Sequence, residues 1–213
     1  MVEELSESRP GYGFLLEEGG EIKGTDPSHR FIIDPLDGTT NFMHAIPHYA
    51  ISIALERNGE LVAGVIYDPS RDEMFRAEKG KGAFLNDRRL RVSIRTDLES
   101  SVLSTGIPFK GKPGHAQFLK ELHAMSQHVS GIRRYGSAAL DLAWLAAGRY
   151  DGFWERNLQL WDIAAGIVLI REAGGVVTDM DGGAKIDGRS ILSANSEIYD
   201  LMKQNLDAVK PGK

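Results

Sequence analysis

Residues 34–42, Asp-Pro-Leu-Asp-Gly-Thr-Thr-Asn-Phe, combine two carboxylates with a glycine and two threonines. Carboxylate and carbonyl oxygens are the ligands that hard cations such as Mg²⁺ prefer. Gly38 lets the main chain approach a ligand closely, and the free amides of a turn or helix start at residues 38–40 can hold a phosphate. This short segment therefore has the residue types for a metal site beside an anion-binding site.

The shorter pattern Asp-x-x-Asp-Gly also occurs in ordinary turns, where aspartate accepts hydrogen bonds from nearby amides and glycine takes a positive φ. Its setting here is more specific. The preceding residues Phe31, Ile32 and Ile33 are apolar and largely β-branched, which predicts a short buried strand. Pro35 favours an extended conformation at Asp34 and has no amide hydrogen. We therefore predict a strand that ends in a cluster of oxygen ligands.

Two further segments carry acidic residues of interest. Phe14-Leu15-Leu16-Glu17-Glu18 precedes the segment above, and residues 161–166, Trp-Asp-Ile-Ala-Ala-Gly, follow it and continue to a pair of glycines at 174–175. In this order, the three segments resemble the motifs of the inositol monophosphatase family of metal-dependent phosphatases. The resemblance extends from about residue 12 to about residue 195, which is most of the chain.

Carried over residue by residue, the resemblance implies two Mg²⁺ ions and a weaker third. The implied ligands are acidic side chains and one main-chain carbonyl: Glu17, Glu18, Asp34, Asp37, Asp162 and the carbonyl of Leu36. Asp34 would bridge two ions, and Glu18 would help to hold the third. Glu17 and Thr39 would act as catalytic residues by orienting the attacking water. Alone, Glu17-Glu18 is more often a solvated pair and Asp162 a plain helix cap, so the conjunction carries the prediction.

The resemblance also implies a set of substrate-binding residues: Leu36, Asp37, Gly38, Thr39, Gly136, Ser137, Ala138 and Glu155. The amides of Gly38 and Thr39 would bind the phosphate. Residues 136–138 begin a helix and would meet a hydroxyl or phosphate through main-chain amides, although simple helix capping also explains them. Glu155, seven residues before Asp162, matches the family's alcohol-binding glutamate; the alternative is an exposed charge at the end of a strand.

The 213-residue chain is long enough for one substantial core, and we treat residues 1–213 as a single domain. It has no cysteine, no apolar run long enough to span a bilayer, and an acidic start unlike a signal peptide. These features predict a cytoplasmic protein that does not contact a membrane. The net charge of −5 argues weakly against general nucleic-acid binding.

Patterning predicts two halves. Residues 1–130 are rich in strands, with a hairpin turn at Asn58-Gly59 inside an antiparallel meander. Residues 131–213 alternate helix and strand, with helices expected at 138–146 and from about 162 to 173. This predicts an α/β or α+β fold, and the resemblance implies a sandwich of alternating helix and sheet layers with the active site where the halves meet. We expect the first helix layer to be missing and the polar tail, residues 203–213, to be partly disordered.

The implied function is Mg²⁺-dependent hydrolysis of a small phosphate monoester, in the first place myo-inositol monophosphate, by a homodimer. Another sugar phosphate such as fructose 1,6-bisphosphate is an alternative substrate. A different function is binding of RNA or of the transcription machinery through the same scaffold, since residues 71–95 contain eight basic and four acidic residues. The solvated face of a β-meander also explains that excess.

Overall fold

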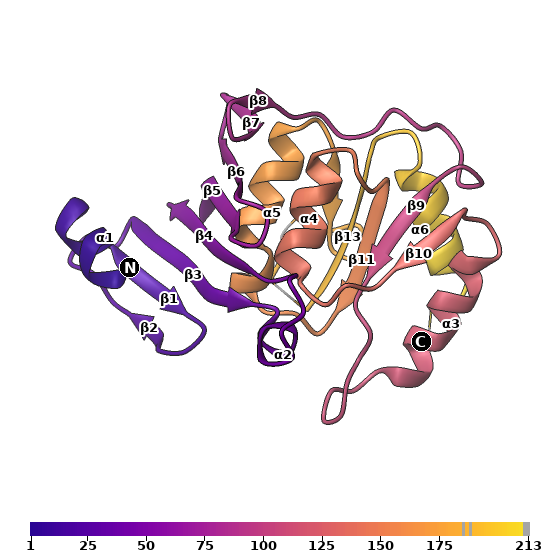
Figure 1. Ribbon diagram of the computed structural model, residues 1–213, viewed down its shortest axis with the longest axis horizontal. Coiled ribbons are helices and arrows are strands. Elements are labelled where there is room, and N and C mark those ends of the chain that lie inside the picture. Colours follow the sequence, from indigo (N-terminus) through magenta and orange to yellow (C-terminus); the bar gives the residue numbers. More distant parts are fainter. Residues whose placement is uncertain (185, 188, 211–213) are drawn as a thin grey trace.

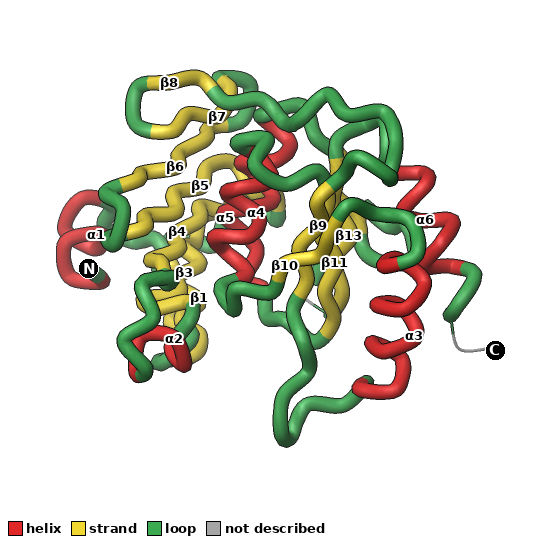
Figure 2. Tube along the Cα trace, turned by 45° about the vertical axis from the view of Figure 1, so that its right-hand side comes forward, coloured by secondary structure: helices red, strands yellow, loops and turns green. Residues whose placement is uncertain are grey.

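Sheets and helices alternate in layers along the long axis of the molecule (Figure 1). The computed structural model describes residues 1–184, 186–187 and 189–210. An eight-stranded sheet comes first, then a pair of helices, then a five-stranded sheet, and a second pair of helices covers the far side (Figures 1 and 2). The mixed, layered fold expected from the sequence is therefore the one observed.

The larger sheet has the strand order β2-β1-β3-β4-β5-β6-β7-β8. Its strands are β1 Gly13–Leu16, β2 Gly20–Ile22, β3 His29–Asp37, β4 Ala50–Arg57, β5 Glu60–Asp68, β6 Glu73–Glu78, β7 Gly82–Leu85 and β8 Arg88–Arg89. From β3 onward each strand is antiparallel to the next, as a meander requires. The predicted hairpin turn is confirmed, because Asn58 and Gly59 join β4 to β5 with φ values of 53° and 77°.

The smaller sheet has the order β10-β9-β11-β13-β12. Its strands are β9 Val102–Thr105, β10 Gly131–Arg133, β11 Gly152–Arg156, β12 Val176–Thr178 and β13 Ser190–Ala194. β9, β10 and β11 run parallel, whereas β13 is antiparallel to both of its neighbours.

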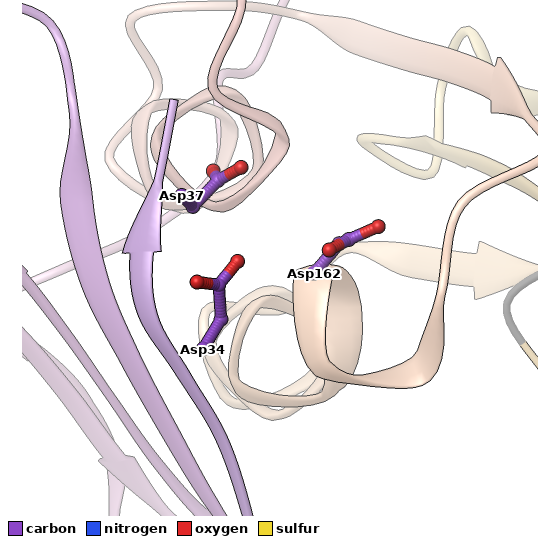
Figure 3. A group of neighbouring side chains, drawn as sticks. All are labelled: Asp34, Asp37 and Asp162. Atoms are coloured by element: carbon purple, nitrogen blue, oxygen red, sulfur yellow. The ribbon is translucent and has the colours of Figure 1, made fainter. Parts of the chain in front are cut away.

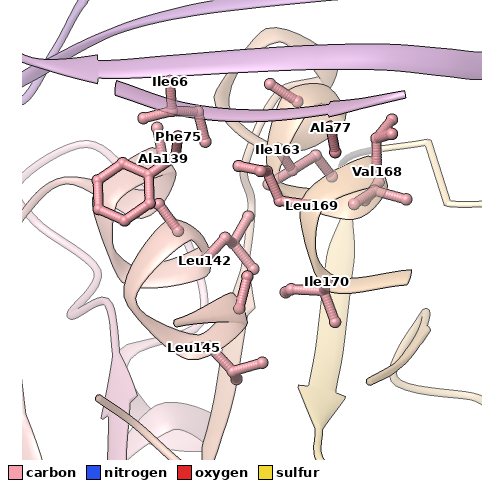
Figure 4. Close-up of a cluster of buried hydrophobic side chains, with 14 of the residues drawn as sticks. Ile66, Phe75, Ala77, Ala139, Leu142, Leu145, Ile163, Val168, Leu169 and Ile170 are labelled. Atoms are coloured by element: carbon pink, nitrogen blue, oxygen red, sulfur yellow. The ribbon is translucent and has the colours of Figure 1, made fainter. Parts of the chain in front are cut away.

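Two helices, α4 Ala138–Ala146 and α5 Leu160–Glu172, fill the space between the sheets (Figure 1). Helix α4 is buried on nearly every side, including at Asp141, because it is enclosed by both sheets and α5. Figure 4 shows the resulting core, in which Ile66 and Phe75 of the larger sheet meet Leu142 of α4 and Ile163 of α5. Glycine allows close approach here: a Cβ at Gly64 would lie 2.7 Å from the carbonyl oxygen of Ala165.

The remaining helices are α1 Val2–Ser8, α2 Thr39–Met43, α3 His115–Ser126 and α6 Tyr199–Asp207. α3 and α6 cover the outer face of the smaller sheet (Figure 2), and α1 places Val2 and Leu5 on an apolar cluster of the larger one. The expectation of a disordered tail from residue 203 is wrong as far as α6 extends, because Met202 and Leu206 are buried against β13 and the core beneath it; residues 211–213 lie outside the described residues. None of the described helices is long and apolar enough to cross a bilayer.

Candidate active site

A β-bulge in β3 brings Asp34 and Asp37 to the same side of the larger sheet. In a regular strand, residues three apart point to opposite faces. Here Asp34 pairs with Ser52 and Asp37 with Ala50, so β3 uses one more residue than β4 over the same stretch. An extra residue resets the alternation of side chains. Pro35, which has no amide hydrogen to donate, lies inside this irregular stretch, so the sequence places proline where a ladder bond is lost anyway.

Asp162 reaches the same point from the first turn of α5. Its carboxylate accepts a hydrogen bond of 2.7 Å from the amide of Gln159, the N-cap residue, and so stabilises the start of the helix. The hydroxyl of Ser52 donates to the carbonyl of Trp161 at 3.3 Å. Since Ser52 is the partner of Asp34 across the sheet, this contact fixes the start of α5 beside Asp34.

The three aspartates lie close together, two from β3 and one from the start of α5 (Figure 3). Each offers a carboxylate oxygen that lies within 4.8 Å of those of the other two. Asp34 and Asp162, which are 128 positions apart in the chain, thus lie side by side. The resemblance of the motifs to those of a known family implied this proximity, whereas the spacing of the residues alone did not.

These carboxylates line a cavity of about 240 Å³. Eleven of the twelve residues expected at the site line it: Glu17, Asp34, Leu36, Asp37, Gly38, Thr39, Gly136, Ser137, Ala138, Glu155 and Asp162. Glu18 is the exception and is exposed in the turn between β1 and β2. Glu17, one residue earlier in the same turn, reaches the cavity because its amide is bonded to the carbonyl of Ile33, next to Asp34.

The start of α4 is bonded directly to Asp37. The Ser137 hydroxyl donates to Asp37 Oδ2 at 2.6 Å, and the amide of Ala139 donates to the same oxygen at 2.7 Å. Ser137 also accepts from the amide of Leu140, which confirms it as the helix cap. One serine therefore caps the helix and orients a carboxylate of the site.

Gly38 and Thr39 form the start of α2 at the edge of the cavity. Gly38 has φ 93° and a Cβ there would lie 3.0 Å from the carbonyl oxygen of His48, so only glycine fits without strain. The Thr39 hydroxyl donates to the carbonyl of Leu36 at 3.0 Å. This bond folds the chain back on itself, and Gly38, Thr39 and Thr40 at the start of α2 line the same cavity as the carboxylates.

Burial and mutual repulsion raise the pKa values of the three aspartates. Burial and then the charge of Asp37 raise the pKa of Asp34 to about 9. Burial, followed by the charges of Asp162 and Glu17, raises the pKa of Asp37 to about 7, and burial raises the pKa of Asp162 to about 6. No lysine or arginine of the described residues forms an ion pair with them. Such a set of crowded oxygen donors fits a hard divalent cation, which would relieve the repulsion.

Glu155 lies at the end of β11, on another wall of the cavity. A Cβ at Gly106 would lie 1.9 Å from Glu155 Oε1, so the carboxylate rests directly on the main chain after β9. Burial, then the charges of Asp37 and Asp162, raises the pKa of Glu155 to about 8. The carboxyl group is thereby suited to exchange hydrogen bonds with hydroxyl groups of a ligand.

Several cavity residues belong to no motif that the sequence offered, among them Gly106, Lys112, Arg134 and Asp141. Asp141 did carry a signal, since it is the one charged residue in the otherwise apolar helix segment Ala-Ala-Leu-Asp-Leu-Ala-Trp-Leu-Ala. An acidic residue is almost never fully buried without a reason. Gly106, Lys112 and Arg134 stand in loops or at strand ends, where no periodicity marks them.

Comparison with known proteins identifies relatives of this chain. A sequence model of the Inositol monophosphatase family matches residues 1–210. An inositol-1-monophosphatase of Caulobacter vibrioides is 56% identical over 212 residues, which are 98% of this chain and 83% of that protein. The Nus factor SuhB of Escherichia coli is 44% identical over 97% of this chain and 78% of its own length. The crystal structure of extragenic suppressor protein suhB from Bartonella henselae is 58% identical and superposes with a TM-score of 0.94 over 96% of this chain and 79% of that one.

Proposed function

Since the chain belongs to the inositol monophosphatase family of phosphatases, we propose that it hydrolyses myo-inositol monophosphate to inositol and phosphate with the help of Mg²⁺. The observation that carries this proposal is the convergence of Asp34, Asp37 and Asp162 beside the start of α2. A phosphatase of this kind needs carboxylates for a divalent cation and free amides for the phosphate, and both stand at one cavity.

Two or three Mg²⁺ ions would be held by oxygen donors: Glu17, Glu18, Asp34, Asp37, Asp162 and the carbonyl of Leu36. When bound, such ions lower the pKa of a coordinated water and neutralise charge on the leaving oxygen. Glu18 supports this scheme least, because its side chain is exposed and outside the cavity lining. Its part would be limited to a weaker, solvent-facing ion.

The chain's own groups would bind and orient the substrate. The amides of Gly38 and Thr39 would hold the phosphate, with Glu17 and Thr39 orienting the attacking water. The substrate's alcohol would lie against Glu155 and residues 136–138, whose amides begin α4. Because Ser137 and Ala139 already donate to Asp37, that carboxylate keeps a fixed direction toward the cavity.

The test is phosphate release from myo-inositol 1-phosphate in Mg²⁺ and in EDTA, measured for the wild type, Asp37→Asn and Asp87→Asn. Asp87 is an exposed acid in the turn between β7 and β8, so its variant removes the same charge away from the cavity. We expect wild type and Asp87→Asn to require Mg²⁺, and Asp37→Asn to lose activity by at least about 100-fold. Full turnover in EDTA would refute the proposal.

Choice of substrate needs its own measurement. Assays with fructose 1,6-bisphosphate alongside myo-inositol 1-phosphate compare kcat/KM under identical Mg²⁺. We expect the inositol ester to be preferred. A higher kcat/KM for the bisphosphate would keep the metal chemistry but change the proposed substrate.

A second candidate function, binding of RNA or of the transcription machinery, is favoured by the 44% identity to the Escherichia coli relative named Nus factor SuhB. The basic residues at 71–95 lend it little support. Four of them pair with acids: Arg71 with Asp68, Lys79 with Glu60, Lys81 with Glu78, and Arg95 with Asp151. Fluorescence anisotropy with labelled RNA at increasing salt tests the idea, and absence of binding at low salt removes it.

We also propose that the protein is a cytoplasmic homodimer. Phe42, Met43 and Ile46 form an exposed apolar group at and after α2, with exposed fractions of 52, 70 and 48%, and apolar groups of this kind are commonly covered in oligomers. Light scattering coupled to size-exclusion chromatography should give twice the monomer mass. A monomer at all concentrations would contradict this assignment.

A further inference from the structure

Asp141 is a buried acid that lines the cavity and has one oxygen without a hydrogen-bond partner in the described part of the chain. It lies on α4, lines the cavity, and is only 2% exposed. Its Oδ1 atom is buried with no hydrogen-bond partner, and no ion pair reaches the side chain among the described residues. Buried polar groups in proteins are nearly always hydrogen-bonded, so an unpaired oxygen on a residue that lines a cavity indicates a missing partner.

Asp141 lies on the same helix as the groups that donate hydrogen bonds to Asp37. Ala139, whose amide donates to Asp37, precedes Asp141 by two residues in α4. With a rise of about 1.5 Å per residue, Asp141 lies about 3 Å further along the helix axis. Its side chain lies on the same face of α4 as Ser137, four residues earlier, whose hydroxyl donates to Asp37.

Glu155 lines the same cavity. Its charge is the electrostatic influence that acts most strongly on Asp141, ahead of that of Asp37. Burial, followed by these two charges, raises the pKa of Asp141 well above its usual range. A neutral carboxyl group both donates and accepts a hydrogen bond, as a ligand hydroxyl does.

One other buried group competes as the missing partner. The Tyr150 hydroxyl is also buried, it has no hydrogen-bond partner within residues 1–184, 186–187 and 189–210, and the charge of Asp141 acts on it. A water between Asp141 and Tyr150 would satisfy both within the fold and leave nothing for a ligand. The cavity lining includes Asp141 and excludes Tyr150, which favours the ligand as the partner.

We propose that Asp141 is a specificity-determining residue that hydrogen-bonds a hydroxyl group of the substrate's polyol, beside Glu155. The inference rests on the proposed phosphatase function and names a contact for the alcohol part of that substrate. Helix α4 then has two roles. The amide of Ala139 in its first turn orients Asp37, and Asp141 in the next turn binds the alcohol part of the substrate.

The experiment measures kcat and KM for myo-inositol 1-phosphate, together with the inhibition constant of inorganic phosphate, in Mg²⁺. The variants are Asp141→Leu, Asp141→Ala, Asp141→Asn and Tyr150→Phe. Inorganic phosphate probes the metal and amide side of the cavity without touching the polyol side. Leucine fills the volume of the aspartate, alanine leaves room for water, and asparagine keeps both a donor and an acceptor.

We expect Asp141→Leu and Asp141→Ala to raise KM about tenfold, the loss of one hydrogen bond, with phosphate inhibition changed less than about twofold. Asp141→Asn should stay within about threefold of the wild type, and Tyr150→Phe should match it. An equal rise of KM in Tyr150→Phe, or an equal weakening of phosphate inhibition, would overturn the inference, since either indicates a role within the fold. Wild-type protein inactive on every phosphate monoester in Mg²⁺ would instead refute the proposed function.

Discussion

His48 is a buried imidazole that the protein keeps neutral. It is 3% exposed, packs edge-on against Trp144 at 5.3 Å between ring centroids, and its Nε2 atom has no hydrogen-bond partner among the described residues. Burial, followed by the charge of Arg71, lowers the pKa of His48 to about 4. A proton can therefore bind more readily to this residue in the unfolded chain than in the folded protein.

The contribution of His48 to the stability of the protein decreases as the pH falls. Because the folded pKa of about 4 lies below the ordinary value of 6.5, the unfolded state binds more protons between these pH values, and stability rises with pH across that window. The contribution of His48 should drop by about 2 kcal/mol from pH 7 to pH 5. Urea unfolding at both pH values, in wild type and in His48→Phe, measures it.

The phenylalanine keeps a ring at the position and cannot titrate, so the difference between the two proteins isolates His48 and cancels the carboxylates of the site. His44→Phe is the matched control, because His44 is exposed. An identical loss of stability in wild type and His48→Phe would contradict the assignment.

Single residues of the candidate site could be predicted from the sequence where they belong to motifs that combine several carboxylates with glycine and threonine. Asp34, Asp37 and Asp162 stood in recognisable motifs, and Glu155 had a matching distance to Asp162. Gly106 could not be found in this way, because its role comes from a neighbour distant in the chain, the Glu155 carboxylate that rests on it. Asp141 could have been singled out as a charge in an apolar helix.

Among the elements, α4 depends on a single hydroxyl group for two bonds. Ser137 caps the helix through the amide of Leu140 and donates to Asp37 at 2.6 Å. Ser137→Ala should lower the free energy of unfolding by about 1–2 kcal/mol, because a cap and a bond to a carboxylate are lost together. Urea unfolding tests this against Ser196→Ala, in which the exposed serine loses a hydroxyl that donates to the neighbouring Glu197. Equal stability of the two variants would show that the cap contributes nothing measurable.

Helix α5 depends on a glycine in the sheet beneath it. A Cβ at Gly64 in β5 would lie 2.8 Å from the Cα of Ala165, and the main chain of a helix cannot move aside as a flexible side chain can. Gly64→Ala should therefore destabilise the protein by about 1–3 kcal/mol through overpacking. In the control, Gly131→Ala, the same methyl group meets the end of the Arg133 side chain at 2.8 Å, which can move. A Gly64→Ala protein as stable as this control would mean that α5 does not rest on β5 so closely.

Elements were predictable where local chemistry decides them. The Asn-Gly hairpin, the cap at Ser137 and the first turn of α5 at Asp162 are set by neighbours in sequence. The bulge in β3 was not foreseen, because it becomes visible only through its register with β4. Helix α6 was missed for a similar reason: its polar residues suggested a tail, while Met202 and Leu206 pack on a sheet whose position the sequence does not reveal.

On the scale of the whole molecule, the aspartate cluster joins the larger sheet to the helix layer. Asp34 and Asp37 belong to β3 and Asp162 to α5, so their repulsion opposes the packing of α5 on the sheet. Carboxyl groups with pKa values raised to about 9, 7 and 6 hold protons that the unfolded chain releases at lower pH. The contribution of these three carboxyl groups to the stability of the cation-free protein should therefore fall as pH rises from about 4 through 9.

A divalent cation should reverse this trend, because it binds the folded protein and ionised carboxylates. At 100 times its dissociation constant, a ligand stabilises by about 2.7 kcal/mol, which raises the Tm of a protein of this size by roughly 5–10 °C. We expect a saturable rise of Tm with Mg²⁺ that is larger at pH 8.5 than at pH 6.

Calorimetry of wild type, Asp162→Asn and Asp87→Asn in EDTA and in Mg²⁺ separates the repulsion between the carboxylates from the binding of the cation. In EDTA at pH 8.5, Asp162→Asn should melt above the wild type, since one repelling charge is gone while asparagine can still accept the bond from Gln159. In Mg²⁺ it should melt below the wild type, since a ligand is lost, and Asp87→Asn should follow the wild type in both. If Mg²⁺ left the Tm of the wild type unchanged at both pH values, the three aspartates would not form a Mg²⁺ site, and their proximity would be a feature of the fold alone.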